Sequence, residues 1–202
     1  MEVRLITREL TKDFILNIHY AHRMPSISYS YGLYEGTELI GVCTYGTPAS
    51  STLLKGVCGE EYKGIVKELN RLVLKYNRKN EASYLIGQTF KLLPKPLIIV
   101  SYADTAQKHQ GIVYQATNFL YTGLSTKFKD PKVKGLEHQH HATYAHGLTN
   151  KMLKEKFGDR LYFVERSRKH RYVYFLGNKR ETKNLKNKLR YKVSNYPKIR
   201  DE

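Results

Sequence analysis

The chain of 202 residues contains no tryptophan and only two cysteines, and it is poor in acidic side chains and in long apolar runs. No stretch approaches the roughly 18 apolar residues that a membrane-spanning helix needs, which argues against a membrane protein. The charged start of the chain lacks the apolar segment of a signal peptide, so we expect a soluble protein that stays inside the cell. Cys43 and Cys58 have no metal-type spacing, and we expect both to be reduced and buried.

The shortage of acidic residues leaves a strong positive charge. Lysine and arginine number 35 against 18 aspartates and glutamates, which gives a net charge of +17. Such an imbalance predicts a polyanionic partner, with nucleic acid as the first candidate and an anionic membrane surface as the second. Seventeen tyrosines supply rings that could stack on bases, although many will pack in the core.

The length suits one domain, which we place at residues 1–177. From residue 178 the composition shifts to lysine, arginine and asparagine with few apolar side chains. This pattern predicts a basic C-terminal tail over residues 178–202, solvated or in contact with nucleic acid and mobile without its partner.

Apolar patterning predicts an α+β fold on a mixed sheet. We expect the last two strands to form an antiparallel pair, because they lie close together in the sequence. The order of elements is the one that a GNAT-like acyltransferase fold gives, in which a mixed sheet splays open between its central strands so that donor and acceptor meet in the gap. Strands are predicted at residues 1–6, 28–34, 39–45, 62–76, 97–100, 161–164 and 171–176, and helices at 11–23, 81–93, 112–126 and 150–157.

A cluster of polar side chains follows the short β-branched run at residues 97–100. That run is typical of a strand buried on both faces, and ligands commonly bind where such strands end. The segment is therefore the first place to look for chemistry. Its polar residues are Ser101, Tyr102, Asp104, His109, Tyr114, Gln115 and Asn118.

Four stretches of the chain resemble the Mom proteins of bacteriophages: HYAHRMPSISYSYGLY, GVCTYGTP, KELNRLVL and SYADTAQKHQGIVYQATNFLYTG. The likeness runs from about His19 to Gly177. It implies a divergent GNAT-fold enzyme, working in the host cytoplasm, that converts adenine in phage DNA into N6-(carbamoylmethyl)adenine and so blocks host restriction. It also implies that the important positions are His19, Tyr20, Arg71, Ser83, Asp104 and Tyr114.

Four of these positions are candidates for catalysis. Asp104 could act as a base or orient the adenine amino group, and the alternative is an Asx turn or a helix cap. Tyr114 could protonate a leaving group or stack on a flipped base, whereas a lone helical tyrosine more often packs in the core. His19, beside Tyr20 near a helix end, could be a general base or a metal ligand, or only a C-cap.

Arg71 and Ser83 are candidates for holding the donor. An arginine on a central strand needs a buried anion or an open cleft. Ser83, in the first turn of the next helix, could hold a phosphate or simply cap that helix. Typical acetyltransferases cradle the pyrophosphate of coenzyme A with a glycine-containing loop before this helix, but residues 78–83 contain no glycine. The donor candidates are therefore acetyl-CoA bound in another way and an aminoacyl carrier such as glycyl-tRNA.

Further residues are candidates for contact with double-stranded DNA, or with tRNA if tRNA is the donor. Gln115 and Asn118 carry amides able to read a base edge, although solvated surface is the usual role of such residues. Clustered histidines could also hold a transition metal such as iron, and a polar loop facing DNA explains them equally well. The remaining DNA candidates are His109, Arg168, Lys169 and Arg171, and the metal candidates are His19, His138, His140 and His141.

Two other functions fit the sequence. The missing glycine loop is compatible with a DNA-binding protein that has lost catalysis, and a GNAT-like scaffold could transfer an acyl or aminoacyl group to a protein or a small molecule. Nothing in the sequence indicates an oligomeric state.

Overall fold

The computed structural model describes residues 1–139 and 141–197, apart from the side chain of residue 142. Seven strands form one mixed sheet in the order β1-β2-β3-β4-β5-β9-β6, and β7 and β8 form a separate antiparallel pair. No helix in the described part of the chain is long and apolar enough to cross a membrane. The strands are β1 (Glu2–Leu5), β2 (Tyr29–Glu35), β3 (Glu38–Gly46), β4 (Val66–Leu74), β5 (Leu97–Asp104), β6 (Leu120–Leu124), β7 (Lys129–Val133), β8 (Leu161–Glu165) and β9 (Lys169–Leu176).

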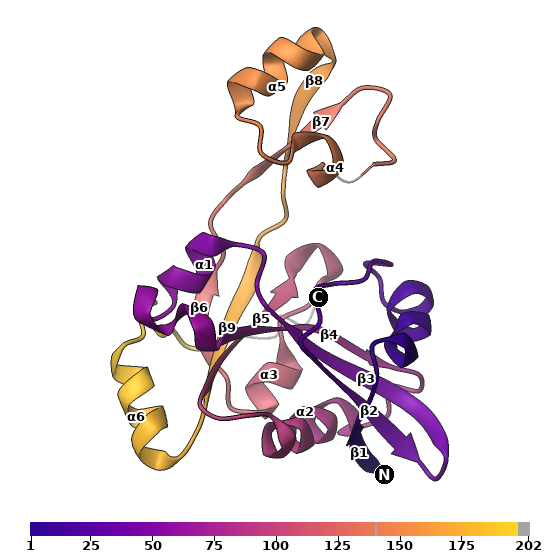
Figure 1. Cartoon of the computed structure of the whole chain (residues 1–202), viewed down its shortest axis with the longest axis vertical. Helices are drawn as coiled ribbons and strands as arrows, with labels where there is room; N and C mark the ends of the chain where they lie inside the picture. Colours follow the sequence, from indigo (N-terminus) through magenta and orange to yellow (C-terminus); the bar gives the residue numbers. More distant parts are fainter. Residues whose placement is uncertain (140, 198–202) are drawn as a thin grey trace.

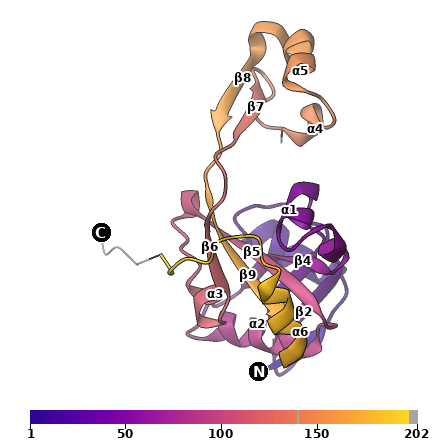
Figure 2. The same cartoon turned by 90° about the vertical axis from the view of Figure 1, so that its left-hand side faces the viewer.

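Helices cover both faces of the large sheet (Figures 1 and 2). On one face α2 (Glu81–Leu92) and α3 (Ile112–Ala116) pack over a core that includes Leu85 and Ile86. On the other face α1 (Ser51–Gly56) and α6 (Lys179–Asn187) pack over Ile98 and Val100. Because β5 is covered on both sides, its apolar run is buried throughout, as the sequence predicts.

The two central strands diverge, and this creates the site. Strands β4 and β5 pair in parallel from Val66 and Ile98 as far as Leu69 and Ser101, although both continue beyond these residues. Each then stays paired only with its outer neighbour, β3 or β9. A mixed sheet that splays between its central strands confirms the predicted GNAT-like fold class.

The N-terminal helix predicted at residues 11–23 is wrong in both length and type. A 3-10 helix, η1 (Glu9–Thr11), and a π-helix, η2 (Phe14–Ile18), replace it. Thr11 does not cap a helix, since its hydroxyl donates a hydrogen bond to the Arg8 carbonyl. The backbone is extended at His19, with ψ of 132°, so the helix ends there.

The helix predicted at residues 112–126 is also wrong. It ends after five residues because Asn118 adopts a left-handed conformation, with φ of 62°. The apolar residues that follow form β6, in which Leu120 and Tyr121 lie opposite residues of β9.

The predicted pairing of the last two strands is wrong as well. Strand β8 pairs with β7, whereas β9 lies between β5 and β6 in the large sheet. The first strand, the hairpin of β2 and β3, and helices α2 and α5 (Asn150–Phe157) are confirmed.

Residues 125–168 form a lobe that projects from the sheet on two chain segments (Figures 1 and 2). It holds β7, β8, α4 (Ala142–Ala145), α5 and a 3-10 turn, η5 (Gly158–Arg160). The lobe has its own small core of Val133, Tyr144 and Leu153. Because β7 and β8 pair over five residues each, the lobe is a folded unit rather than a loop.

The segment after residue 177 contains helix α6 and makes contacts with the domain. Asn178 forms a capping box with Glu181 at the start of α6, and Leu185 of that helix is buried against the sheet. Further on, the Tyr196 hydroxyl donates to the Phe119 carbonyl at 2.7 Å. Leu185 is thus buried and Tyr196 is hydrogen-bonded to the domain, rather than fully solvated as expected. The mobility of this segment and its contact with nucleic acid stay predictions.

Candidate functional site

A cavity of about 680 Å³ opens where β4 and β5 diverge. This volume lies within the range of about 300–1,000 Å³ that ligand sites occupy. Strand β4 and the end of β5 form two walls, and the segment after η2 and the loop before α3 form the others. The polar side chains in these walls include those of His19, Tyr20, Glu68, Arg71, Tyr102, His109, Gln110, Tyr114 and Lys169.

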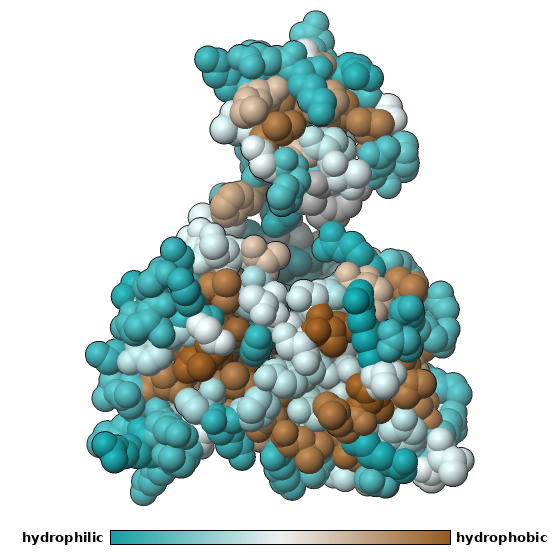
Figure 3. All heavy atoms as spheres, viewed as in Figure 1, coloured by the Kyte–Doolittle hydropathy of each residue, from teal (hydrophilic) through white to brown (hydrophobic). Residues whose placement is uncertain are grey.

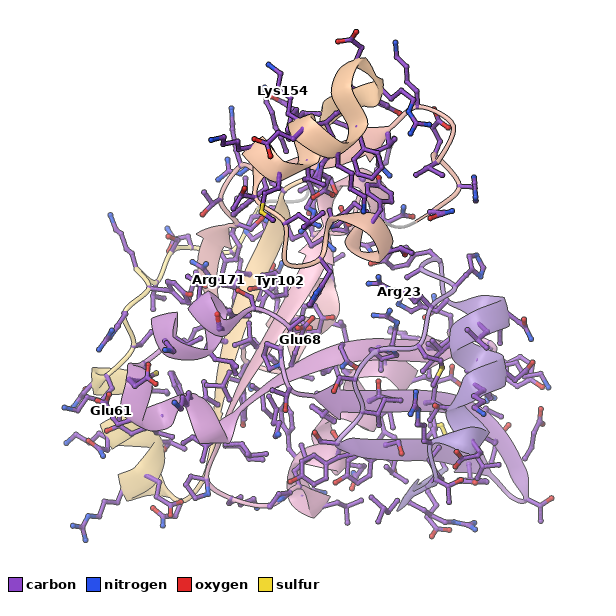
Figure 4. All side chains as sticks on the ribbon, turned by 45° about the horizontal axis from the view of Figure 1, so that its top comes forward. Arg23, Glu61, Glu68, Tyr102, Lys154 and Arg171 are labelled. Carbon is purple, nitrogen blue, oxygen red and sulfur yellow. The ribbon has the colours of Figure 1, made fainter. Side chains whose placement is uncertain are left out.

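Glu68 is a functional candidate that the sequence reasoning missed. It lies on β4 in the cavity wall, close to Tyr102 below the lobe (Figure 4). Burial raises the pKa of its carboxyl group, although the positive charges of Lys169 and Arg71 oppose this. Glu68, like Arg71, is a charged residue within an apolar strand, and this signal in the sequence marks both as candidates.

Asp104 has the opposite environment. Its Oδ1 accepts hydrogen bonds from the Ser167 hydroxyl at 2.7 Å and from the Ala106 N–H at 3.0 Å, and Lys169 Nζ lies 3.3 Å from Oδ2. Burial alone would raise the pKa of this carboxyl, but these three donors together hold it below its ordinary value. The cap that we weighed as the alternative is present, because Asp104 caps the 3-10 turn η4 (Thr105–Gln107).

The two carboxylates therefore suit different roles. Lys169 forms an ion pair with Asp104, and its positive charge also opposes the rise in the pKa of Glu68. When neighbouring environments push two pKa values apart, the group with the raised pKa is the better proton acceptor near neutral pH. Glu68 is thus better suited to act as a base than Asp104, whose contacts position Lys169 in the cavity wall.

Tyr114 brings a protonated phenol to the cavity. Its hydroxyl is hydrogen-bonded with Ser101, whose own hydroxyl donates to the Leu69 carbonyl at 2.9 Å. Burial raises the pKa of Tyr114 far above its ordinary value, so the phenol keeps its proton. The ring also packs against Phe119 and Tyr172, which means that the core role and the site role coexist.

His19, Tyr20 and His109 close one side of the cavity with stacked rings. The His19 and Tyr20 ring centroids lie 4.4 Å apart, and His109 meets Tyr20 edge-on at 5.9 Å. Burial, aided by the charge of Arg71, lowers the pKa of His19 to about 4. Its Nδ1 accepts the Ala21 N–H at 3.0 Å, which leaves the proton of the neutral ring on Nε2. His19 is therefore placed as a hydrogen-bond donor rather than as a base, and it also ends η2.

Arg71 presents a donor that has no partner within the described residues. Its two terminal nitrogens donate to the carbonyls of Asn70 and Arg23, whereas its buried Nε–H is unpaired. The buried Oε1 of Gln110 is also unpaired. Both residues line the cavity, and buried polar groups normally have partners. A ligand or ordered water in this cavity would supply them, so the open cleft expected around Arg71 is present.

The first turn of α2 does not offer a pyrophosphate site. The buried Glu81 carboxylate accepts the backbone N–H of Arg78 at 2.7 Å and also its side-chain Nε–H. The same guanidinium is bound to Glu35, so an incoming phosphate would meet two carboxylates. The Ser83 hydroxyl donates to the Asn80 carbonyl, an ordinary contact of a helix end. Coenzyme A does not fit this turn in the manner typical of acetyltransferases.

Of the candidates for DNA contact, Lys169 and His109 line the cavity. The others lie outside its wall. The Gln115 amide donates to Tyr172 and to the Gln110 carbonyl, and Asn118 lies in the turn after α3. Arg168 Nε donates to the Ser125 carbonyl. Arg171 is bonded to Thr122 and stacks on Tyr191, with its guanidinium 3.4 Å from the ring centroid. These contacts show structural roles, and contact with DNA stays a prediction.

The metal hypothesis gains no support from residues 1–139 and 141–197. No group of three or more histidine, cysteine, aspartate or glutamate side chains lies together there as a metal site. His138 and His141 lie in the lobe, whereas His19 lies in the cavity wall. His140 falls outside the described residues, so a metal site stays a prediction.

A splayed mixed sheet with a polar cavity at the splay defines the class of GNAT-like transferase folds. The family model of the Mom protein family matches residues 1–198, and the chain belongs to this family. It is 28% identical over 212 residues to the methylcarbamoylase Mom of Escherichia phage Mu, covering 98% of this chain and 84% of that protein.

The chain is also similar to solved acetyltransferases at low sequence identity. The Bacillus subtilis acetyltransferase in complex with CoA is 14% identical, with a TM-score of 0.47 over 87% of this chain and 98% of that one. A GNAT family acetyltransferase from Elizabethkingia anophelis with acetyl-CoA bound is 13% identical, with a TM-score of 0.43 over 87% and 97%. At these values the assignment of the fold rests on the sheet topology described above.

Proposed function

We propose that the protein is a transferase that modifies the N6 amino group of adenine in phage DNA, giving N6-(carbamoylmethyl)adenine or a related acyl or glycyl adduct that blocks host restriction. The observation that carries this proposal is the cavity at the sheet splay, which both Glu68 and Tyr114 line, in a member of the Mom family. The net charge of +17 suits a DNA substrate.

The residues of the cavity divide the reaction between them. The adenine must leave the base stack, because N6 is paired in the duplex. As N6 forms its bond to the carbonyl carbon of the donor, the bond from that carbon to the carrier breaks and Glu68 accepts the N6 proton, which gives the acyl or glycyl adduct. The carbamoylmethyl adduct is an isomer of the glycyl adduct, and its formation requires a further step in which N6 and the glycyl amino group exchange places between the carbonyl and methylene carbons. Tyr114, which keeps its phenolic proton, donates a hydrogen bond or the proton to the departing group. The unpaired Nε–H of Arg71 stabilises negative charge that develops on the donor.

The donor is an activated acyl or aminoacyl group. Because Glu81 and Glu35 occupy the region where pyrophosphate would bind in typical acetyltransferases, we assign no step to coenzyme A. An aminoacyl carrier such as glycyl-tRNA fits the glycine skeleton of the carbamoylmethyl group and the positive charge of the chain. Digestion of all RNA in a reconstituted reaction tests this part alone, since modification that survives digestion rules out a tRNA donor.

Mass spectrometry of nucleosides tests the proposed function. Plasmid DNA from bacteria expressing the protein should contain a new adenine nucleoside, and a Glu68→Gln variant should lose it. Unmodified DNA together with tight binding of the protein to DNA would favour the non-catalytic alternative. Unmodified DNA without binding would point to a protein or a small molecule as acceptor.

A further inference from the structure

The lobe of residues 125–168 is anchored at the mouth of the cavity. The carbonyl of Arg168, at its base, accepts hydrogen bonds from the N–H and the hydroxyl of Thr105, directly after β5. Its neighbour Ser167 donates to Asp104, and Lys169 lines the cavity itself. The lobe therefore has a defined place relative to the site, set by hydrogen bonds to the end of β5.

The lobe is strongly basic. Residues 125–168 contain ten lysines and arginines against five aspartates and glutamates, a net charge of +5. Such a surface beside an active site attracts a polyanion. Figure 3 shows the molecule narrowing between the lobe and the sheet.

Cations from both sides meet where the lobe faces the body of the protein. His141 of the lobe lies within electrostatic reach of Lys132 and Arg166 on the lobe and of Arg23, which follows η2. Figure 4 places Arg23 between the N-terminal segment and the lobe. Asp130 also faces this region, but it is paired with Arg166 at 2.9 Å. Glu137 lies within electrostatic reach of Lys132 as well. Three cations against two carboxylates still leave this group of residues with a net positive charge.

We propose that the lobe and the segment that follows η2 form a clamp for the DNA duplex. In this clamp, Lys132 of the lobe and Arg23 of that segment contact phosphates flanking the adenine that enters the cavity. This inference rests on the proposed function, because it takes DNA as the substrate. A flipped base remains attached to its backbone on both sides, so phosphates must lie at the cavity mouth. Cations on two separate elements can hold both directions of that backbone.

The test is the salt dependence of binding to a fluorescent DNA duplex, measured by anisotropy with the full chain and no donor. Each lost phosphate contact lowers the slope of log K against log salt concentration by about 0.9. The double variant R23Q/K132Q should therefore lower the slope by about 1.8. It leaves the Arg166–Asp130 pair intact, and a thermal melt checks its folding.

A matched pair of substitutions serves as the control. K91Q/K95Q removes the same charge from two exposed residues, Lys91 at the end of α2 and Lys95 just before β5. These residues lie near the start of β5, whereas the lobe is anchored at its end. The slope of this control variant should equal that of the wild type. The clamp is refuted if R23Q/K132Q lowers the slope by less than about 1 or if the control variant lowers it equally. It is also refuted if R23Q/K132Q lowers the slope for a folded RNA of equal length by more than it lowers the slope for the DNA duplex. Because no donor is present, this result is independent of whether adenine is modified.

Discussion

Replacing Glu68 with glutamine separates catalysis from folding in this protein. The change keeps the shape of a side chain in the cavity wall and removes its ability to accept a proton. General base catalysis typically contributes a factor of about 10²–10⁴ in rate, which is about 3–5 kcal/mol of the barrier. We expect a loss of that size in the modification of DNA.

The same variant should lose no stability at pH 8. Because the pKa of Glu68 is raised, the folded state binds more protons than the unfolded state at pH values between 4.5 and the raised pKa. The resulting stability is present below pH 4.5 and is lost as the pH rises through the raised pKa. Each unit of that shift costs about 1.4 kcal/mol at higher pH. Glutamine removes this cost, so the variant should be at least as stable as the wild type at pH 8.

The assay is quantitative mass spectrometry of the modified nucleoside in plasmid DNA at limiting expression, paired with thermal melting at pH 5 and pH 8. Glu61→Gln is the control, because Glu61 is exposed on the 3-10 helix η3 (Glu60–Ile65) and points away from the cavity (Figure 4). Retention of more than about a tenth of the wild-type rate would refute a role for Glu68 as the base. A large loss of stability at pH 8 would refute the argument from its raised pKa.

Three further predictions follow from single contacts. Tyr114→Phe and Tyr45→Phe each remove a buried hydroxyl, and each should lower the free energy of unfolding by about 1 kcal/mol. Only Tyr114→Phe should reduce the modification of DNA, because Tyr45 is hydrogen-bonded to Thr89 outside the cavity wall. NMR titration of the His19 ring should give a pKa near 4, so this group should lower stability as the pH falls from 6.5 towards 4, and a midpoint near 6.5 would contradict its burial. Leu185→Ala should destabilise the protein by roughly 2–3 kcal/mol in urea unfolding, and a change below about 0.5 kcal/mol would mean that α6 is not anchored to the sheet.

Local sequence determined the elements whose signals are local. Alternation and turn chemistry specify the hairpin of β2 and β3, where Gly36 adopts a positive φ of 60°. The apolar run before Ser101 specifies a buried strand, and Arg71 and Tyr114, which lie in the family motifs, line the cavity. These features depend on neighbours within a few residues, which a single sequence displays directly.

Pairing between distant segments was decided by the tertiary structure. Residues 120–124 have an apolar pattern that continues a helix equally well, and only their hydrogen bonds to β9 make them a strand. Closeness in sequence suggested a β8–β9 pair, but β8 pairs with β7 inside the lobe, whereas β9 lies between β5 and β6 in the large sheet. The energy of strand pairing comes from partners far along the chain, and the periodicity of one segment does not identify them.

The roles within the site were also decided in three dimensions. The sequence placed charged and aromatic residues at the sheet splay, but the pKa of a carboxyl depends on its burial and its donors. Hydrogen bonds and Lys169 outweigh burial at Asp104, whereas burial outweighs the charges of Lys169 and Arg71 at Glu68. Asp104, which the motif made prominent, therefore positions Lys169, and Glu68, within a strand, is suited to accept the proton.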